Sequence, residues 1–187
     1  MKMYEKAYEL DGQTARILKF VAAARSKKDY RKFFDVIHIE DGKAVATDGI
    51  RLHISELALY NDKPVLDDGD YSVLHEEKKK IVIAKIDDVG FPKWKNIIPT
   101  GKIDQSLKFY TQSKARISQE YAALLVKGGE LAAINIKYIE PLVGEAWTVN
   151  IRKHPKHNKA EFMCNMYPVE FISARSRAYI MTIMIQE

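Results

Sequence analysis

Val45-Ala46-Thr47-Asp48-Gly49-Ile50-Arg51-Leu52-His53-Ile54-Ser55 is the stretch of sequence that decides the fold. Two runs of β-branched and small residues flank the pair Asp48-Gly49, which is typical of a tight turn between strands. The pattern predicts a β-corner that turns Arg51 and Leu52 outward beside Thr47. The segment holds neither a nucleophile paired with a base nor a cluster of metal ligands. It is therefore predicted to display a small, mostly apolar binding surface.

The residues around this corner predict the order strand, helix, strand, strand, strand for the first third of the chain. Asp11 is a good N-cap residue ahead of a helical pattern, and Asp41-Gly42 is a two-residue hairpin signal. β-Branched and aromatic residues are frequent on both sides of that hairpin. The predicted elements are an edge strand over 4–10, a helix over 12–25, and strands over 33–40, 43–47 and 51–55.

The rest of the chain predicts further strands and a second run of one helix and several strands. Gly128-Gly129 is a hairpin signal, and Asn135 is the predicted cap of a short helix. The predicted strands cover 71–74, 80–86, 121–126, 130–134, 147–152, 161–166, 169–172 and 179–185, with helices over 104–114 and 136–143. Two βαβββ units imply an internal duplication and an α+β fold with antiparallel sheets. We expect a first unit over 1–99 and a second over 100–187, together forming one compact domain.

Composition limits the possible partners and compartments. The chain has 187 residues, 47% of them hydrophobic, and a formal net charge of +5, which predicts a packed core and favours polyanionic partners. Cys164 is the single cysteine, so no internal disulfide is possible. The start shows no cleavable signal pattern, and no uncharged apolar run approaches the roughly 20 residues that span a bilayer. We expect a cytoplasmic protein without membrane contact.

One face of the predicted helix over 12–25 is basic. Arg16 and Lys19 lie beside the small residues Ala15 and Ala22, opposite an apolar stripe, and this arrangement would allow close approach to phosphates. The alternative is an ordinary amphipathic helix with solvated cations. Two interpretations are also open for the basic clusters over 25–32, 78–80 and 152–159. They either extend the surface that contacts DNA or only keep the protein soluble.

Catalytic candidates are few. His154 and His157 are spaced for a shared metal, with Glu161 nearby, but Pro155 and the flanking cations favour a basic loop. Cys164 lies in an apolar segment and is predicted to be an inert buried thiol. The acidic run over 67–70 lacks the ligand spacing of a calcium loop. The sequence therefore predicts no catalytic residues, no metal and no cofactor.

Three segments, in order along the chain, resemble one known family. Residues 45–55 are similar to its Ala-Thr-Asp-Gly-His-Arg-Leu segment, and residues 91–99 to its Phe-Pro-Asp-Tyr-x-x-Val-Ile-Pro connector. Residues 179–184 are similar to its C-terminal Tyr-Val-Val-Met-Pro-Met strand, and residues 135–140 to the start of its final helix. The chain thus resembles the bacterial DNA polymerase III beta subunit, the sliding clamp, in a shortened form.

The resemblance implies a clamp-like fold and two kinds of partner. Members of that family form a ring around duplex DNA, with helices lining the hole and sheets outside, and dock short peptides of polymerases and repair proteins in an apolar pocket. Carried over, the DNA-binding residues would be Arg16, Lys19, Arg25, Lys27, Lys28 and Lys137. The peptide-binding pocket would use Thr47, Arg51, Leu52, Pro92, Asn96, Ile97, Ile180, Met181 and Met184.

The chain departs from the family in ways that leave two hypotheses. Ile50 stands where the family has histidine, and Thr182 and Ile183 replace its Met-Pro pair. The usual subunit has three domains and is about twice as long, so a ring of this chain would need more copies than the usual dimer. The first hypothesis is a non-enzymatic clamp-like replication accessory protein, an oligomer that binds duplex DNA and polymerase peptides. The alternative is a phage or mobile-element clamp mimic that binds host replication proteins without encircling DNA.

Overall fold

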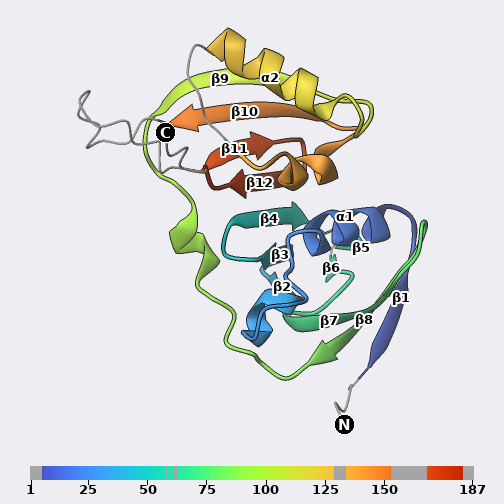
Figure 1. Cartoon of the computed structure of the whole chain (residues 1–187). Helices are drawn as coiled ribbons and strands as arrows, with labels where there is room; N and C mark the ends of the chain where they lie inside the picture. Colours follow the sequence, from blue (N-terminus) through green and yellow to red (C-terminus); the bar gives the residue numbers. More distant parts are fainter. Residues whose placement is uncertain (1–5, 58, 61–62, 129–133, 153–167, 183–187) are drawn as a thin grey trace. The chain divides into compact units, whose positions relative to one another are not determined.

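The computed structural model describes residues 6–57, 59–60, 63–128, 134–152 and 168–182. The chain divides into two compact units, Met1–Trp94 and Lys95–Glu187. In the described part of each unit, an antiparallel sheet is accompanied by one α-helix (Figure 1).

The first unit contains a six-stranded sheet and a small second hairpin. Its strands run in the spatial order β1-β8-β7-β2-β3-β4, and β5 pairs with β6. The elements are β1 (Ala7–Leu10), α1 (Gly12–Ala22), the 3₁₀ turn η1 (Lys32–Asp35), β2 (Val36–Glu40), β3 (Lys43–Thr47), β4 (Arg51–Glu56), β5 (Leu59–Tyr60), β6 (Lys63–Pro64), β7 (Gly69–Glu76) and β8 (Ile81–Ile86).

The sequence predicted most of this unit correctly. Asp41 and Gly42 both have positive φ, 52° and 70°, which is the geometry of a tight two-residue hairpin between β2 and β3. The predicted helix over 12–25 ends three residues early, because Ala24 and Arg25 donate to carbonyls three residues back and tighten its last turn. The predicted strand over 33–40 begins as the turn η1 and becomes extended only at Val36.

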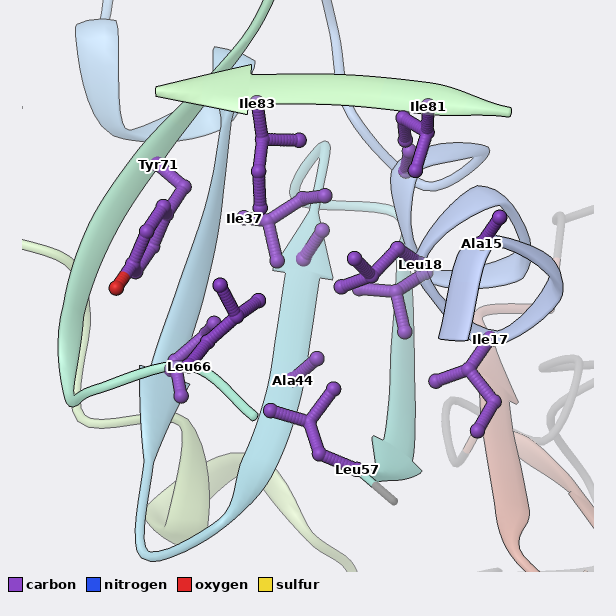
Figure 2. Packing of buried hydrophobic residues seen from close by; sticks show 14 of the residues in the cluster. Ala15, Ile17, Leu18, Ile37, Ala44, Leu57, Leu66, Tyr71, Ile81 and Ile83 are labelled. Atoms are coloured by element: carbon purple, nitrogen blue, oxygen red, sulfur yellow. The ribbon is translucent and has the colours of Figure 1, made fainter. Parts of the chain in front are cut away.

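The core of the first unit lies between α1 and the sheet. The apolar stripe of α1 includes Ala15, Leu18 and Val21, which are buried together with Ile37 of β2 and Ile83 of β8. In Figure 2, the labelled side chains from the helix and from the strands point into one common space. Burying each large aliphatic side chain contributes about 1.5–3 kcal/mol, so this face fixes α1 on the sheet.

The second unit repeats the order strand, helix, strand, strand, strand. Its sheet order is β12-β11-β10-β9. The elements are β9 (Ile103–Tyr110), α2 (Ile117–Gly128), the 3₁₀ turns η3 (Ile136–Tyr138) and η4 (Glu140–Leu142), β10 (Ala146–Arg152), β11 (Val169–Ile172) and β12 (Ser176–Ile180). A further 3₁₀ turn, η2 (Trp94–Ile97), spans the boundary between the units. Two βαβββ units in an α+β fold are therefore confirmed.

Within the second unit, two predicted elements have the wrong type. The predicted helix over 104–114 is strand β9, in which exposed and more buried residues alternate up to the buried Phe109. The predicted strand over 121–126 lies in helix α2, where Ile117 and Tyr121 are buried one helical turn apart. Gly128 is the last residue of α2, so the predicted hairpin does not begin there.

The short helix predicted over 136–143 is two 3₁₀ turns. Asn135 caps the first as expected, since its Oδ1 accepts from the Lys137 N–H at 3.0 Å. Pro141 has no N–H to donate, which prevents one continuous helix. The predicted strand over 179–185 ends at Ile180. The predicted strand over 161–166 and most of the one over 130–134 lie outside the described residues.

Candidate functional site

The corner between β3 and β4 is held by two short polar side chains. The Thr47 hydroxyl donates to the Arg51 carbonyl at 2.7 Å and accepts from the Gly49 N–H at 3.0 Å. The Asp48 carboxylate accepts from the N–H groups of Ile50 and Arg51, both at 3.0 Å. These bonds satisfy the backbone groups that the tight turn removes from the strand ladder.

Arg51 and Gly49 complete this corner. The Arg51 Nε lies 3.0 Å from Asp48 Oδ2, so this guanidinium is paired within the turn. Gly49 has φ of 86°, and a Cβ there would approach the Phe34 ring to 3.1 Å. A residue other than glycine would therefore meet both strain and crowding. The turn is a rigid unit packed on Phe34.

Leu52 does not point outward, and that prediction was wrong. Leu52 is 3% exposed and Thr47 is 4% exposed, whereas Ile50 at the turn is 43% exposed. Thr47 and Leu52 are directly paired across β3 and β4, so they share one face of the sheet. His53 and Ala46 occupy the other face, where α1 packs. The exposed apolar residue of the corner is therefore Ile50.

The connector after β8 is bound along the face that carries Thr47 and Leu52. The Val89 N–H donates to Asp70 Oδ2 at 2.9 Å, and Phe91 stacks on His38 with ring centroids 4.7 Å apart. The other oxygen of Asp70 lies 2.7 Å from His38 Nδ1. Trp94 then donates from its indole to Glu40 Oε2 at 2.7 Å and is buried. Trp94 thus anchors the connector to β2.

The other proposed peptide-binding residues have different environments. Pro92 of the first unit is half-buried. In the second unit, Asn96 and Ile97 are exposed, with Ile97 at 47%, while Ile180 is buried and Met181 half-buried. Met184 lies outside the described residues. A joint role in peptide binding stays a prediction for these residues.

The six predicted DNA-binding residues fall into an exposed, a half-buried and a buried group. Arg16, Lys27, Lys28 and Lys137 are exposed. Lys19 is half-buried, and its ammonium donates to the Glu77 carbonyl.

Arg25 is buried and therefore differs from the other five. Its guanidinium lies 3.1 Å from Asp35 and 2.9 Å from Glu76, and burial lowers its pKa although both carboxylates oppose that shift. Arg25 ties the end of α1 to the sheet and is not an exposed cation. No local sequence pattern indicates this pairing, because Glu76 is far away along the chain.

Sequence reasoning also missed the role of His53. Its ring stacks on Phe20 at 4.5 Å, and its Nδ1 lies 2.7 Å from the Phe20 carbonyl, in the last turn of α1. The neutral ring can donate this bond and so cap an orphan helix carbonyl. Burial lowers the pKa of His53 to about 4. No pattern in the sequence distinguishes it from other strand histidines.

The second unit contains a buried polar network on its sheet. Glu170 of β11 accepts from Asn150 at 3.0 Å and from Tyr179 at 2.8 Å, and its carboxylate lies 2.8 Å from Arg152. Burial raises the pKa of Glu170, but these three partners outweigh it, and the net shift is downward. The negative charge on Glu170 is thus stabilised by side chains of the two neighbouring strands, β10 and β12. This network is structural in character.

Neither a metal site nor a membrane span is found in the described parts of the chain. Among those residues, no three His, Cys, Asp or Glu side chains are grouped so that they could hold a metal ion. His154, His157, Glu161 and Cys164 lie outside them. No described helix is both long enough and apolar enough to cross a bilayer.

Comparisons of sequence found no match, whereas solved structures match well. No family model matches the chain, and no curated protein matches it. The structure is similar to the DNA polymerase sliding clamp of Pseudomonas aeruginosa, with a TM-score of 0.56 and 11% identity over 99% of this chain and 68% of the clamp.

Two further clamps give the same result. The DNA polymerase III subunit beta of Borrelia burgdorferi, in complex with a natural product, has a TM-score of 0.57 and 12% identity over 98% of this chain and 65% of its own. The DNA polymerase III beta chain of Streptococcus pneumoniae has a TM-score of 0.56 and 13% identity over 99% and 66%. These matches span about two thirds of each clamp. The chain therefore has the fold of the bacterial sliding clamp, in a shortened form.

Proposed function

We propose that this protein is a non-enzymatic, clamp-type accessory factor of DNA replication in the cytoplasm. It contacts duplex DNA through exposed cations and docks peptides of DNA polymerases or other clamp-binding proteins. The observation that carries this proposal is the clamp fold, whose likeness extends over 98–99% of the chain. Because identity is only 11–13%, the likeness concerns the fold, and the partners need experiments of their own.

The DNA contact is proposed for the exposed part of the basic set. Arg16, Lys27, Lys28 and Lys137 are available to phosphates, whereas Arg25 is buried in ion pairs and is left out. Lys19 would have to release the Glu77 carbonyl before it could contact DNA. A few exposed cations give loose, sequence-independent contact with phosphates, as sliding requires.

The peptide contact is proposed for the corner, the connector and the C-terminal strand. Thr47, Arg51 and Leu52 shape the corner, and the exposed Ile97 with half-buried Pro92 and Met181 offers apolar surface. Asn96, Ile180 and Met184 complete the proposed set. Flexible methionines and a rigid turn suit a site that accepts several short peptides.

Ile97→Asp tests the peptide contact without disturbing a core. Capture of a peptide from a clamp-binding polymerase by the purified chain should fall at least about tenfold, because a charge would enter an apolar contact. Ile103→Asp is the matched control, since Ile103 is 42% exposed on β9 and lies outside the proposed set. Equal capture by both variants and the parent chain would exclude Ile97 from the peptide site.

Retention on circular DNA tests the clamp function as a whole. A protein that encircles DNA stays on a nicked circular plasmid during gel filtration and is lost once the plasmid is linearised. We expect this difference at moderate salt, after loading by the cognate loader or by spontaneous ring opening. Equal elution with circular and linear DNA would show that no ring encloses the duplex.

The clamp-mimic hypothesis is the second candidate, and one observation favours it. Arg25 and Lys19 of the basic set are engaged within the chain. A mimic would capture clamp-binding peptides without topological retention on DNA. Peptide capture combined with equal elution from circular and linear plasmid would therefore select this alternative.

A further inference from the structure

The loop between α1 and β2 is fixed at its base. The Ser26 N–H donates to the Phe34 carbonyl at 2.7 Å and closes the segment over 26–34, called here the Tyr30 loop. Arg25, immediately before it, is held by Asp35 and Glu76, and the Phe34 ring lies against Gly49 of the β3–β4 corner. The loop is thus anchored to the first unit at both of its ends.

The inside of the Tyr30 loop is ordered by one ion pair. The Asp29 carboxylate accepts from the Arg31 backbone N–H and from two nitrogens of its guanidinium, each at 2.9 Å. Arg31 lowers the pKa of Asp29 to about 2, so the pair persists at neutral pH. The Arg31 guanidinium lies 4.2 Å from the Phe34 ring centroid and 5.4 Å from that of Tyr30.

This arrangement displays Tyr30 to solvent. Its ring is supported by Arg31, yet the residue is 89% exposed, the largest value among the exposed large hydrophobic residues described. Lys27, Lys28 and Lys32 around it are also exposed. Asp29 is the single carboxylate of the segment over 26–32 and is already paired with Arg31, so the surface charge around the ring is positive.

An exposed aromatic ring surrounded by cations suits a polyanion that also presents flat rings. Duplex DNA offers phosphates, but its bases are already stacked and paired, so none of them is free to stack on the Tyr30 ring. Single-stranded DNA offers both phosphates and unpaired bases, and base stacking on an aromatic side chain tolerates any sequence. An acidic peptide would match the charge, but it presents no flat surface to this protruding ring.

We propose that the Tyr30 loop binds single-stranded DNA, with Tyr30 stacking on an unpaired base and Lys27, Lys28 and Lys32 contacting the flanking phosphates. The inference deepens the proposed function, on which it rests, by adding a second form of DNA to the same basic surface. A factor that binds duplex DNA would thereby recognise a place where the duplex opens into a single strand.

The test is fluorescence anisotropy of the full chain with two labelled probes, an oligothymidylate of about 20 nucleotides and a duplex of similar length. Tyr30→Ala should weaken binding to the single strand about five- to a hundredfold and leave the duplex unaffected, because only the single strand can stack. Tyr30→Phe keeps the ring and should retain the affinity. Tyr110→Ala removes a tyrosine that is 52% exposed in the second unit and should change nothing.

The lysines make a separate prediction in the same assay. Lys28→Ala should weaken the binding of both probes and reduce the salt dependence of single-strand binding by about 0.7 in the log–log slope. Tyr30→Ala should leave that slope unchanged, which separates stacking from phosphate contact.

The remaining outcomes distinguish the inference from the proposed function. If the duplex binds but Tyr30→Ala leaves single-strand binding unchanged, the inference is overturned and the proposed function stands. If neither probe binds, both the inference and the DNA-binding half of the proposed function are overturned. Binding of a labelled oligoglutamate peptide that is lost in Tyr30→Ala, without single-strand binding, would assign the loop to an acidic protein partner and overturn the inference.

Discussion

At the scale of single residues, Asp48 holds the corner of the proposed site together. Its carboxylate holds two backbone N–H groups and the Arg51 guanidinium, and the residue lies at the turn that joins β3 to β4. The sequence predicted the corner from Asp48-Gly49, but not the direction of Leu52. The direction in which a strand side chain points depends on which segments pack against each face of the sheet. Those segments are distant in sequence, so the local pattern does not reveal it.

Asp48→Ala should destabilise the protein by about 1–3 kcal/mol, because it removes the carboxylate that accepts from two turn N–H groups and from the Arg51 Nε–H. Asp48→Asn keeps one acceptor oxygen and should lose less. Urea unfolding followed by tryptophan fluorescence measures both, with Ile50→Ala as the matched control at the exposed tip of the turn. A loss for Asp48→Ala no larger than that of the control would contradict this role.

His53 makes stability depend on pH. Its pKa is about 4 in the folded protein and 6.5 in the unfolded chain, so acid favours the unfolded state, which binds the proton more readily. The contribution is fully present above pH 6.5 and is lost as the pH falls towards 4. Between pH 7.5 and 5, His53 alone should reduce the free energy of unfolding by about 2 kcal/mol.

Urea unfolding of the parent chain and of His53→Gln at several pH values isolates this effect. The variant should be less stable at pH 7.5 and should lose less stability on acidification than the parent chain. His75→Gln is the control, because His75 is exposed and its Nε2 lies 3.2 Å from the exposed Glu77 carboxylate. Parallel pH profiles for the parent chain and His53→Gln would argue against a buried, neutral His53.

At the scale of elements, local pattern predicted the hairpin between β2 and β3 but not the types of β9 and α2. The hairpin between β2 and β3 depends on two adjacent residues with positive φ. The Asp41-Gly42 pair that favours this geometry is visible in the sequence itself. Strand β9 contains several charged and polar residues because much of it is exposed, and this resembles a helix. Helix α2 contains consecutive apolar residues that also suit a strand, and its type is decided by which residues it buries against β9.

Trp94 provides the element-scale prediction for the connector. Trp94→Ala should destabilise the chain by about 3–5 kcal/mol, since it removes a buried ring and leaves Glu40 without the indole N–H. Trp94→Phe keeps most of the volume and should cost about 1 kcal/mol for the lost hydrogen bond. Urea unfolding followed by circular dichroism measures both, and Lys93→Ala is the exposed neighbouring control. If Trp94→Ala lowers the free energy of unfolding only slightly, contacts other than Trp94 hold the connector in place.

At the scale of the whole molecule, the number of copies separates the two proposed functions. The match to this chain spans about two thirds of each solved clamp. Strand β1 lies at one edge of the first unit's sheet and strand β9 at one edge of the second unit's sheet, and strand edges can pair with another copy.

For a clamp we expect a closed oligomer, with a mass that is a whole multiple of 21.5 kDa in sedimentation equilibrium. A closed ring has no free edges, so its mass should stay constant as concentration rises, whereas open head-to-tail association would continue to larger species. If Lys or Glu side chains on the edge strands contribute to the contact between copies, the stability of the assembly should depend on salt. The measurement should therefore be repeated at two ionic strengths. A monomer at every concentration would exclude a self-assembled ring and leave the clamp mimic as the remaining function, because peptide docking needs a single copy.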